Sequence, residues 1–169
     1  TGLPGGGGGG GGSSDYTVDK TEIEASELNT LDSQYGTVDA SAVTTITGTA
    51  ADINTVYTAS SAGTITGLGN EAVTITDSIT SAQANTIDAY TTGAVTATIS
   101  TTAIADLDDL TGTGNAYTIT VADSSVTAAA LNTVNAATTV NVTATAVTTI
   151  TGTAAQLATT YGGGITGLG

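Results

Sequence analysis

The chain has 169 residues and a formal net charge of −14, with one Lys or Arg against 15 Asp or Glu, and it contains neither Cys nor His. The absence of Cys excludes disulfides and zinc–sulfur sites, and the absence of His removes the usual general base. Most common enzyme mechanisms are therefore not expected. An acidic surface with a single cation is repelled by phosphate, so nucleic acid binding is not expected. No apolar run approaches the roughly 18 residues of a membrane span, so none is expected.

The N-terminal segment, residues 1–15, is rich in glycine. Pro4 is followed by an unbroken glycine run from Gly5 to Gly12, which is typical of a flexible linker. A contact with a neighbouring copy is the alternative, with Gly5, Gly8 and Gly12 as candidate interface residues. Thr-Gly-Leu opens the chain and recurs at 66–68 and 166–168, so Leu168 and Gly169 are candidate interface residues where one periodic unit would meet the next.

Residues 16–169 repeat a common pattern. Segment 140–169 nearly reproduces segment 38–69, and the two start 102 residues apart. Strands are expected to begin near Tyr16, Val38, Val73, Val95, Tyr117 and Val140, at spacings of about 22 residues, with one longer step of 35 that carries an inserted segment ending at Gly69. A fixed period of this size predicts an all-β, parallel β-solenoid of about six coils with short helical turns. An α/β solenoid of leucine-rich-repeat-like shape is the alternative.

A short helical element is expected between successive strands. Each has apolar residues at i and i+3, which fall on one helical face. These pairs are Leu28 and Leu31, Ile53 and Val56, Ala84 and Ile87, Ile104 and Leu107, and Leu131 and Val134. The expected N-caps are Ser26, Thr49, Ser81, Thr102 and Thr127.

The expected strands alternate apolar residues with threonine. Period two turns the apolar residues inward and the threonines outward. In-register stacking would place Thr74, Thr96, Thr118 and Asn141 in one outer file, and Thr76, Thr98, Thr120 and Thr143 in a second. Such a face suits a water-ordering, ice-binding surface, and it equally suits a parallel sheet in which threonine is simply a good strand residue.

Acidic residues form two dense clusters. Asp106, Asp108 and Asp109 make the first and are a candidate calcium site, whereas Glu22, Glu24 and Glu27 make the second. Neither an EF-hand loop nor a Gly-Gly-x-Gly-x-Asp nonapeptide is present, and acids that favour helix N-termini on a solvated face are the alternative reading. Calcium is the one candidate ligand, and no other cofactor is expected.

A polysaccharide-cleaving enzyme would need positioned acids beside cations or aromatic rings that hold the sugar. The chain offers Lys20 alone as a cation and has no Trp or Phe. An enzyme is therefore not expected.

Three sequence words carry a resemblance to a known group of proteins. They are Ser26 to Asp32, Ala42 to Ala51 with its second copy at Ala146 to Ala155, and Ile65 to Thr74. In these words the chain resembles the repeat regions of giant acidic cell-surface and secreted proteins of marine cyanobacteria. The resemblance implies an extracellular, adhesin-like or filament-forming role and assigns no residue to a site.

The expected function is that of an extracellular structural protein, a subunit of a filament or surface layer that assembles through its ends and sides. Its partner would be further copies of itself. The alternatives are an adhesin stalk, for which a cell-surface glycan is a candidate partner, and an ice-binding protein.

Overall fold

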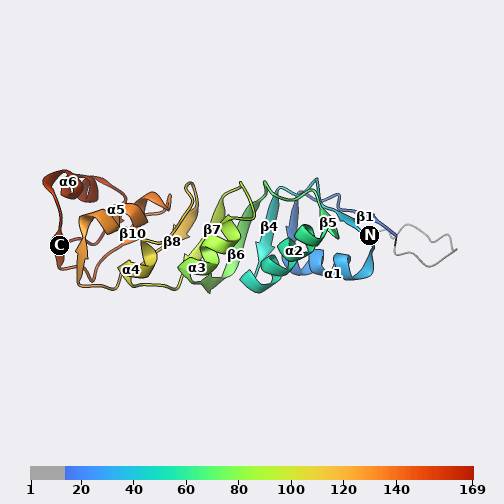
Figure 1. Cartoon of the computed structure of the whole chain (residues 1–169), viewed down its shortest axis with the longest axis horizontal. Coiled ribbons are helices and arrows are strands. Elements are labelled where there is room, and N and C mark those ends of the chain that lie inside the picture. Colours follow the sequence, from blue (N-terminus) through green and yellow to red (C-terminus); the bar gives the residue numbers. More distant parts are fainter. Residues whose placement is uncertain (1–13) are drawn as a thin grey trace.

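The computed structural model describes residues 14–169, which form an elongated molecule with the N- and C-terminal ends at opposite extremes (Figure 1). Helices and strands alternate along the chain, and the described residues form a mixed α/β structure with parallel sheets. The prediction of an all-β β-solenoid is wrong, because residues 14–169 contain six helices, the longest of 13 residues, beside the parallel sheets.

The helices lie between strands in every unit of the repeat. They are α1 (Ala25–Gln34), α2 (Ala50–Ala62), α3 (Ser81–Asp88), α4 (Ile104–Leu107), α5 (Ala128–Ala136) and α6 (Ala154–Gly162). Thr49 and Thr127 cap α2 and α5 through their side chains, as predicted. The predictions for Ser26, Ser81 and Thr102 are wrong, because the residues at the N-cap positions of α1, α3 and α4 are Glu24, Thr80 and Ala103.

The strands are short and pair in parallel. In the N-terminal half they are β1 (Tyr16–Thr17), β2 (Glu22–Glu24), β3 (Val38–Asp39), β4 (Thr45–Gly48), β5 (Ile65–Thr66), β6 (Ala72–Ile79) and β7 (Val95–Ile99). In the C-terminal half they are β8 (Ala116–Thr118), β9 (Ser125–Thr127), β10 (Val142–Thr143), β11 (Thr149–Thr151) and β12 (Ile165–Thr166).

Four sheets result from this pairing. Their strand orders are β1-β3-β5, β2-β4-β6-β7-β8, β9-β11 and β10-β12. Strands that the spacing of 22 and 35 residues placed in one file therefore fall in different sheets. Val38 pairs with Tyr16 and Ile65, whereas Val73 pairs with Ile46 and Val95. The supposed insertion before Gly69 supplies β5, which is a regular member of the first sheet.

The core is a thin apolar column between the sheets and the helices. Helix residues at the expected inward positions are buried, with Leu31 and Ile104 only partly so. Strand residues Val73, Val95, Tyr117 and Val142 are also buried, in keeping with the period-two pattern. Val140, expected to open a strand, instead precedes β10 and is 38% exposed.

Threonine and asparagine side chains join neighbouring units of the repeat. Thr44 and Thr148 each donate from both their backbone N–H and their Oγ1 to one carbonyl of the previous unit, that of Thr21 and of Ser124 respectively. Between helices, Asn29 and Asn132 donate from Nδ2 to carbonyls 23 and 24 residues later. Many threonines and asparagines thus satisfy backbone groups of a neighbouring unit, which explains why these residue types recur at the repeat period.

Two glycines allow this close stacking. A Cβ on Gly48 would lie 2.9 Å from the Cβ of Ala25, and a Cβ on Gly152 would lie 2.9 Å from the Cβ of Ala128. Both distances are too short for carbon atoms in contact. The Thr-Gly-Thr-Ala word that the two repeats share therefore marks the point where a strand end crosses the start of the preceding helix.

No helix within residues 14–169 has the length and apolar character needed to cross a bilayer.

Candidate functional site

The predicted glycine contact residues Gly5, Gly8 and Gly12 lie outside the described residues. At the other end, Leu168 packs partly buried against the core and Gly169 is exposed. Only the C-terminal member of the predicted end contact can therefore be described.

The predicted calcium ligands lie on and just after α4. Asp106 and Asp109 line one open surface pocket together with Thr80, Asn85 and Thr101, and Asp108 is not part of its lining. Within residues 14–169, no three acidic, His or Cys residues gather closely enough to hold a metal ion. The calcium hypothesis gains no support from this arrangement and stays a prediction.

The predicted threonine files are formed only in part. Thr74 pairs with Thr96, and Thr120 forms a bridge with Thr143, as expected. The remaining members follow a different register. Thr98 pairs with Ser78 on one side and with Thr118 on the other, so Thr76 and Thr118 do not continue the expected files. The irregularity between Thr74 and Ser78 in β6 displaces Thr76, whereas Thr118 is displaced by the register of β7 on β8, in which Thr96 pairs with Ala116.

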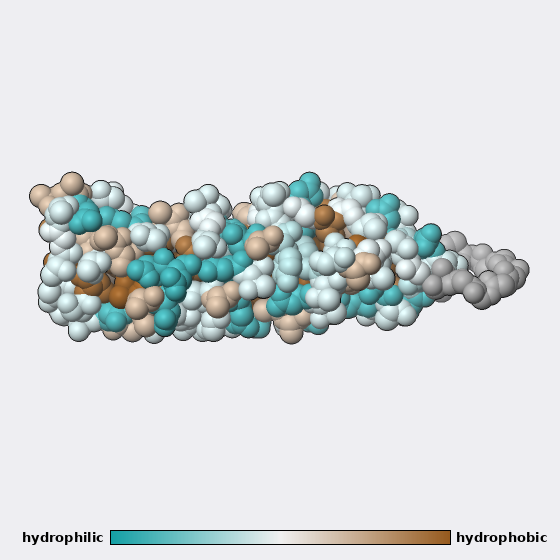
Figure 2. Space-filling view, viewed as in Figure 1, coloured by the Kyte–Doolittle hydropathy of each residue, from teal (hydrophilic) through white to brown (hydrophobic). Residues whose placement is uncertain are grey.

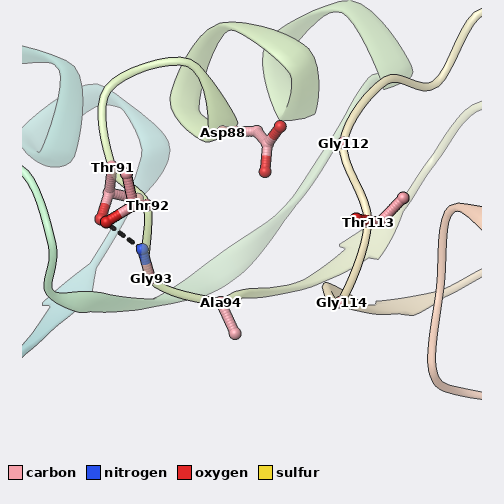
Figure 3. Close-up of a pocket in the computed structure, with 8 residues that line it drawn as sticks. All are labelled: Asp88, Thr91, Thr92, Gly93, Ala94, Gly112, Thr113 and Gly114. Atoms are coloured by element: carbon pink, nitrogen blue, oxygen red, sulfur yellow. Dashed lines mark hydrogen bonds between the residues drawn. The ribbon is translucent and has the colours of Figure 1, made fainter.

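A second open pocket, of about 340 Å³, lies between the end of α3 and the loop before β8 (Figure 3). Asp88 is its one charged lining residue, and Oδ1 of Asp88 accepts a hydrogen bond from Asn115 Nδ2 at 2.7 Å. Backbone of Gly112 and Gly114 and the small residues Thr91 to Ala94 form much of the remaining wall (Figure 3). The lining holds no nucleophile beside a base and no pair of carboxylates, so it offers no recognisable catalytic geometry.

A buried polar cluster closes the first copy of the repeat. The ring of Tyr57 stacks on that of Tyr90 with centroids 4.8 Å apart, and the Tyr57 hydroxyl is hydrogen-bonded to the Glu71 carboxylate. Glu71 is buried, and its Oε2 also accepts from the backbone N–H groups of Gly69 at 2.7 Å and Asn70 at 3.1 Å. Burial, and then the hydrogen bond to Glu71, raise the pKa of Tyr57. The carboxylate thus fixes the turn that leads from β5 into β6.

In the second copy of the repeat, no described residues cover the equivalent tyrosine in this way. The strand pairing of this copy shows that Val142 is the equivalent of Val38, because Val142 pairs with Ile165 as Val38 pairs with Ile65. Val38 is therefore equivalent to Val142, two residues later than the Val140 with which the sequence alone aligned it. Tyr161 is then the equivalent of Tyr57, and it is 60% exposed where Tyr57 is 3% exposed.

Three aliphatic residues of the first copy are likewise more buried than their equivalents in the second copy. Ile46, Ile53 and Ile65 are fully buried in the first copy. Their equivalents in the second copy are only partly buried, and together with Tyr161 they form what we call the end surface: Ile150, Leu157, Tyr161 and Ile165. In the first copy β6 and α3 cover β4 and α2, whereas no described residues take that place beside β11 and α6.

The edge strands of the end surface also offer backbone groups. Val142 and Ala144 donate to the carbonyls of Gly164 and Thr166, so by the alternation of a parallel ladder the N–H and C=O of Ile165 point away from the preceding unit. The same alternation applies to Ile150 in β11, since Thr149 donates to Ser124. Apolar side chains and free strand groups therefore occur together at this end.

Charge is distributed unevenly along the molecule. No Asp, Glu, Lys or Arg occurs after Asp123, so α5, α6 and the strands β9 to β12 carry no charged side chain. Figure 2 shows small apolar patches on a largely polar face, including brown patches in the part toward the C-terminal end. An uncharged, partly apolar surface of this kind can be buried without the cost of desolvating ions.

Comparisons with protein-family models, with curated proteins and with solved structures found no match.

The sequence contains the signal for the end surface, although reasoning from sequence alone missed it. The repeated words make Tyr57 and Tyr161 comparable. Only the strand pairing shows which residues are equivalent, and only the burial of each side chain shows that one copy is covered and the other is not.

Proposed function

We propose that this chain is a structural protein that assembles with other copies of itself end to end, with the end surface as one half of the contact. The observation that carries the proposal is the difference in exposure between two copies of one repeat. The first copy shows what the surface accommodates, namely a further strand beside β4 and a further helix beside α2. Another copy of the chain contains strand–helix units of this kind.

The expected strength of one junction is modest. Completing the burial of a half-exposed aliphatic side chain contributes roughly 1 kcal/mol, and each new backbone hydrogen bond roughly 0.5–1.5 kcal/mol. Association itself costs about 4–15 kcal/mol, so three aliphatic residues need the tyrosine and the strand pairing to reach a favourable total. Assembly should therefore depend steeply on protein concentration.

The test is to follow assembly of the chain by sedimentation velocity and negative-stain electron microscopy over a wide range of concentration. Elongated particles longer than a single copy are expected at high concentration. Tyr161→Glu places a charge on the end surface at an exposed position and should abolish them, and Leu157→Glu should do the same. Thr98→Glu, on the exposed outer face of β7, is the matched control and should leave assembly unchanged.

Circular dichroism melts of each variant separate loss of assembly from loss of folding. A chain that stays a uniform monomer at the highest concentration would overturn the proposal. Equal loss of assembly in Thr98→Glu and Tyr161→Glu would also overturn it, because added charge alone would then be responsible.

An extracellular location, which the resemblance implies, is part of the proposal. The adhesin-stalk alternative predicts a monomer at all concentrations in the same experiment. The ice-binding alternative requires unbroken threonine files, and the register shift in β6 removes its main support.

A further inference from the structure

We infer that copies join head to tail: the end surface of one copy binds the N-terminal unit of the next, and Tyr161 is the anchor residue of the contact. This inference rests on the proposed function and adds the identity of the partner surface. It starts from the environment that the chain itself builds around Tyr57.

Tyr57 shows what a tyrosine at this place in the repeat requires. An aromatic ring covers it, with an angle of 16° between the planes of Tyr57 and Tyr90, and a carboxylate bonds its hydroxyl. Among the described residues, Tyr161 has neither a stacked ring nor a hydrogen-bond partner. A complementary surface should therefore supply a tyrosine ring and a carboxylate.

The N-terminal unit of the chain carries both groups. Tyr16 and Tyr35 are partly buried and stack on each other with centroids 4.8 Å apart. The same unit holds the densest acidic stretch of the chain, with six Asp or Glu between residues 15 and 32 and Lys20 paired with Glu27. Its first strand also has an edge that no strand within residues 14–169 pairs with. Tyr16 and Val18 donate to β3 and its flanking residues, so the N–H of Thr17 points the other way.

Two copies could join through two N-terminal units, through two end surfaces, or through one of each. The distribution of charge favours the last arrangement. Two N-terminal units would bring two acidic stretches together, which is repulsive. Two end surfaces would bring no charged side chains together, but neither carries an Asp or Glu side chain for the tyrosine hydroxyl. Only an end surface against an N-terminal unit joins an uncharged surface to one that holds carboxylates.

A contact of this type is heterologous, so each added copy presents the same free end surface again. Such contacts generate open filaments when the rotation between copies does not close a ring. The inferred product is therefore a linear polymer in which all copies point in one direction.

The first test is chemical labelling of tyrosine with tetranitromethane, read residue by residue by mass spectrometry, in dilute monomer and in assembled protein. Labelling of Tyr161 should fall at least fivefold on assembly. Tyr90, which is 37% exposed on the side of the molecule beside α3, is the internal control and should not change. Tyr57 should be protected in both states.

The second test uses two blocked variants. Thr17→Pro removes a strand N–H at the N-terminal edge, and Tyr161→Glu blocks the end surface. Each alone should remain monomeric, whereas an equimolar mixture should give a one-to-one dimer and nothing larger. Homodimers of Thr17→Pro would show that end surfaces meet each other and would overturn the inference.

Two further substitutions separate the contribution of the Tyr161 ring from that of its hydroxyl. Tyr161→Phe keeps the ring and loses the hydroxyl, so it should raise the critical concentration roughly tenfold, while Tyr161→Ala should raise it further. Assembly in which Tyr161 remains fully labelled would overturn this inference and leave the proposed function intact. A chain that never assembles would overturn both.

Discussion

Thr160 donates a hydrogen bond from Oγ1 to Oδ1 of Asn132 at 2.8 Å and so joins α6 to α5. Between α1 and α2 the same arrangement is incomplete. Asn29 takes the place of Asn132 and Val56 that of Thr160, and Oδ1 of Asn29 is buried with no hydrogen-bond partner among the described residues. A single residue therefore decides whether the amide between two stacked helices is fully paired.

Thr160→Val should reproduce this defect in the second copy. We expect the free energy of unfolding to fall by about 1–3 kcal/mol, because the partly buried amide oxygen of Asn132 loses its donor. Thr159→Val is the matched control, since Thr159 is exposed and bonds only within its own helix, and it should change stability by less than about 0.5 kcal/mol. Urea unfolding of dilute protein measures both. Equal effects of the two substitutions would contradict the role given to Asn132.

Gly152→Ala tests the close crossing of strand end and helix start. The added methyl group would meet Ala128, so we expect a loss of about 1–3 kcal/mol from overpacking. Gly162→Ala is the control with the opposite sign. Its Cβ would meet nothing within 4 Å, and Ala is the better helix former, so a gain of about 0.5–1 kcal/mol is expected. A stabilised Gly152→Ala would show that the crossing is looser than described.

Asn115→Asp should destabilise the middle of the molecule. Asn115 is almost fully buried, donates to Asp88 and accepts from the N–H of Val95 at 2.8 Å. A carboxylate in its place keeps the acceptor but faces Asp88 with like charge, and we expect a loss of about 3 kcal/mol or more at neutral pH. Acidification should restore part of the stability as one carboxyl becomes protonated. Thermal melts at pH 7 and pH 4 would measure it, and a pH-independent loss would contradict the charge argument.

The two most buried tyrosines predict a loss of stability in alkali. Burial raises the pKa of Tyr57 and of Tyr117 above the usual value of 10.0, with the hydrogen bond to Glu71 as the second cause for Tyr57 and the charge of Asp88 for Tyr117. Because the folded state holds the neutral hydroxyl, this contribution is complete below about pH 10. It is lost as the pH rises above that value, where the unfolded chain ionises first.

Phenylalanine substitutions distinguish the two tyrosines. Tyr57→Phe should cost about 1–3 kcal/mol at neutral pH, since Glu71 loses a donor. Tyr117→Phe should be neutral or stabilising by up to about 1 kcal/mol, because the Tyr117 hydroxyl is buried without a partner among the described residues. Both should flatten the alkaline loss of stability in melts between pH 8 and pH 11. An unchanged alkaline slope in both variants would contradict the assignment.

The sequence by itself determined the repeat, the inward residues and the sign of the surface charge. Leu28, Ile53, Leu131 and Val73 could be placed in the core because side-chain direction follows helix and strand periods, which are local properties. The absence of Cys and His likewise limited the chemistry without any structure.

Tertiary structure decided how much of each unit is helix. The helices are rich in Ala, Thr, Ser and Asn and are too short to persist alone, so local propensity did not separate an all-β chain from a mixed one. Stacking of one helix on the next, through contacts such as Asn132 with Gln156 and Thr160, stabilises them.

Tertiary structure also decided the register and the candidate site. Spacing alone grouped Val38 with Val73, and only pairing showed that Val38 lies beside Ile65. Tyr57 and Tyr161 occur in nearly identical words, yet one is buried and the other exposed, because burial depends on which unit stacks next and not on the residues themselves.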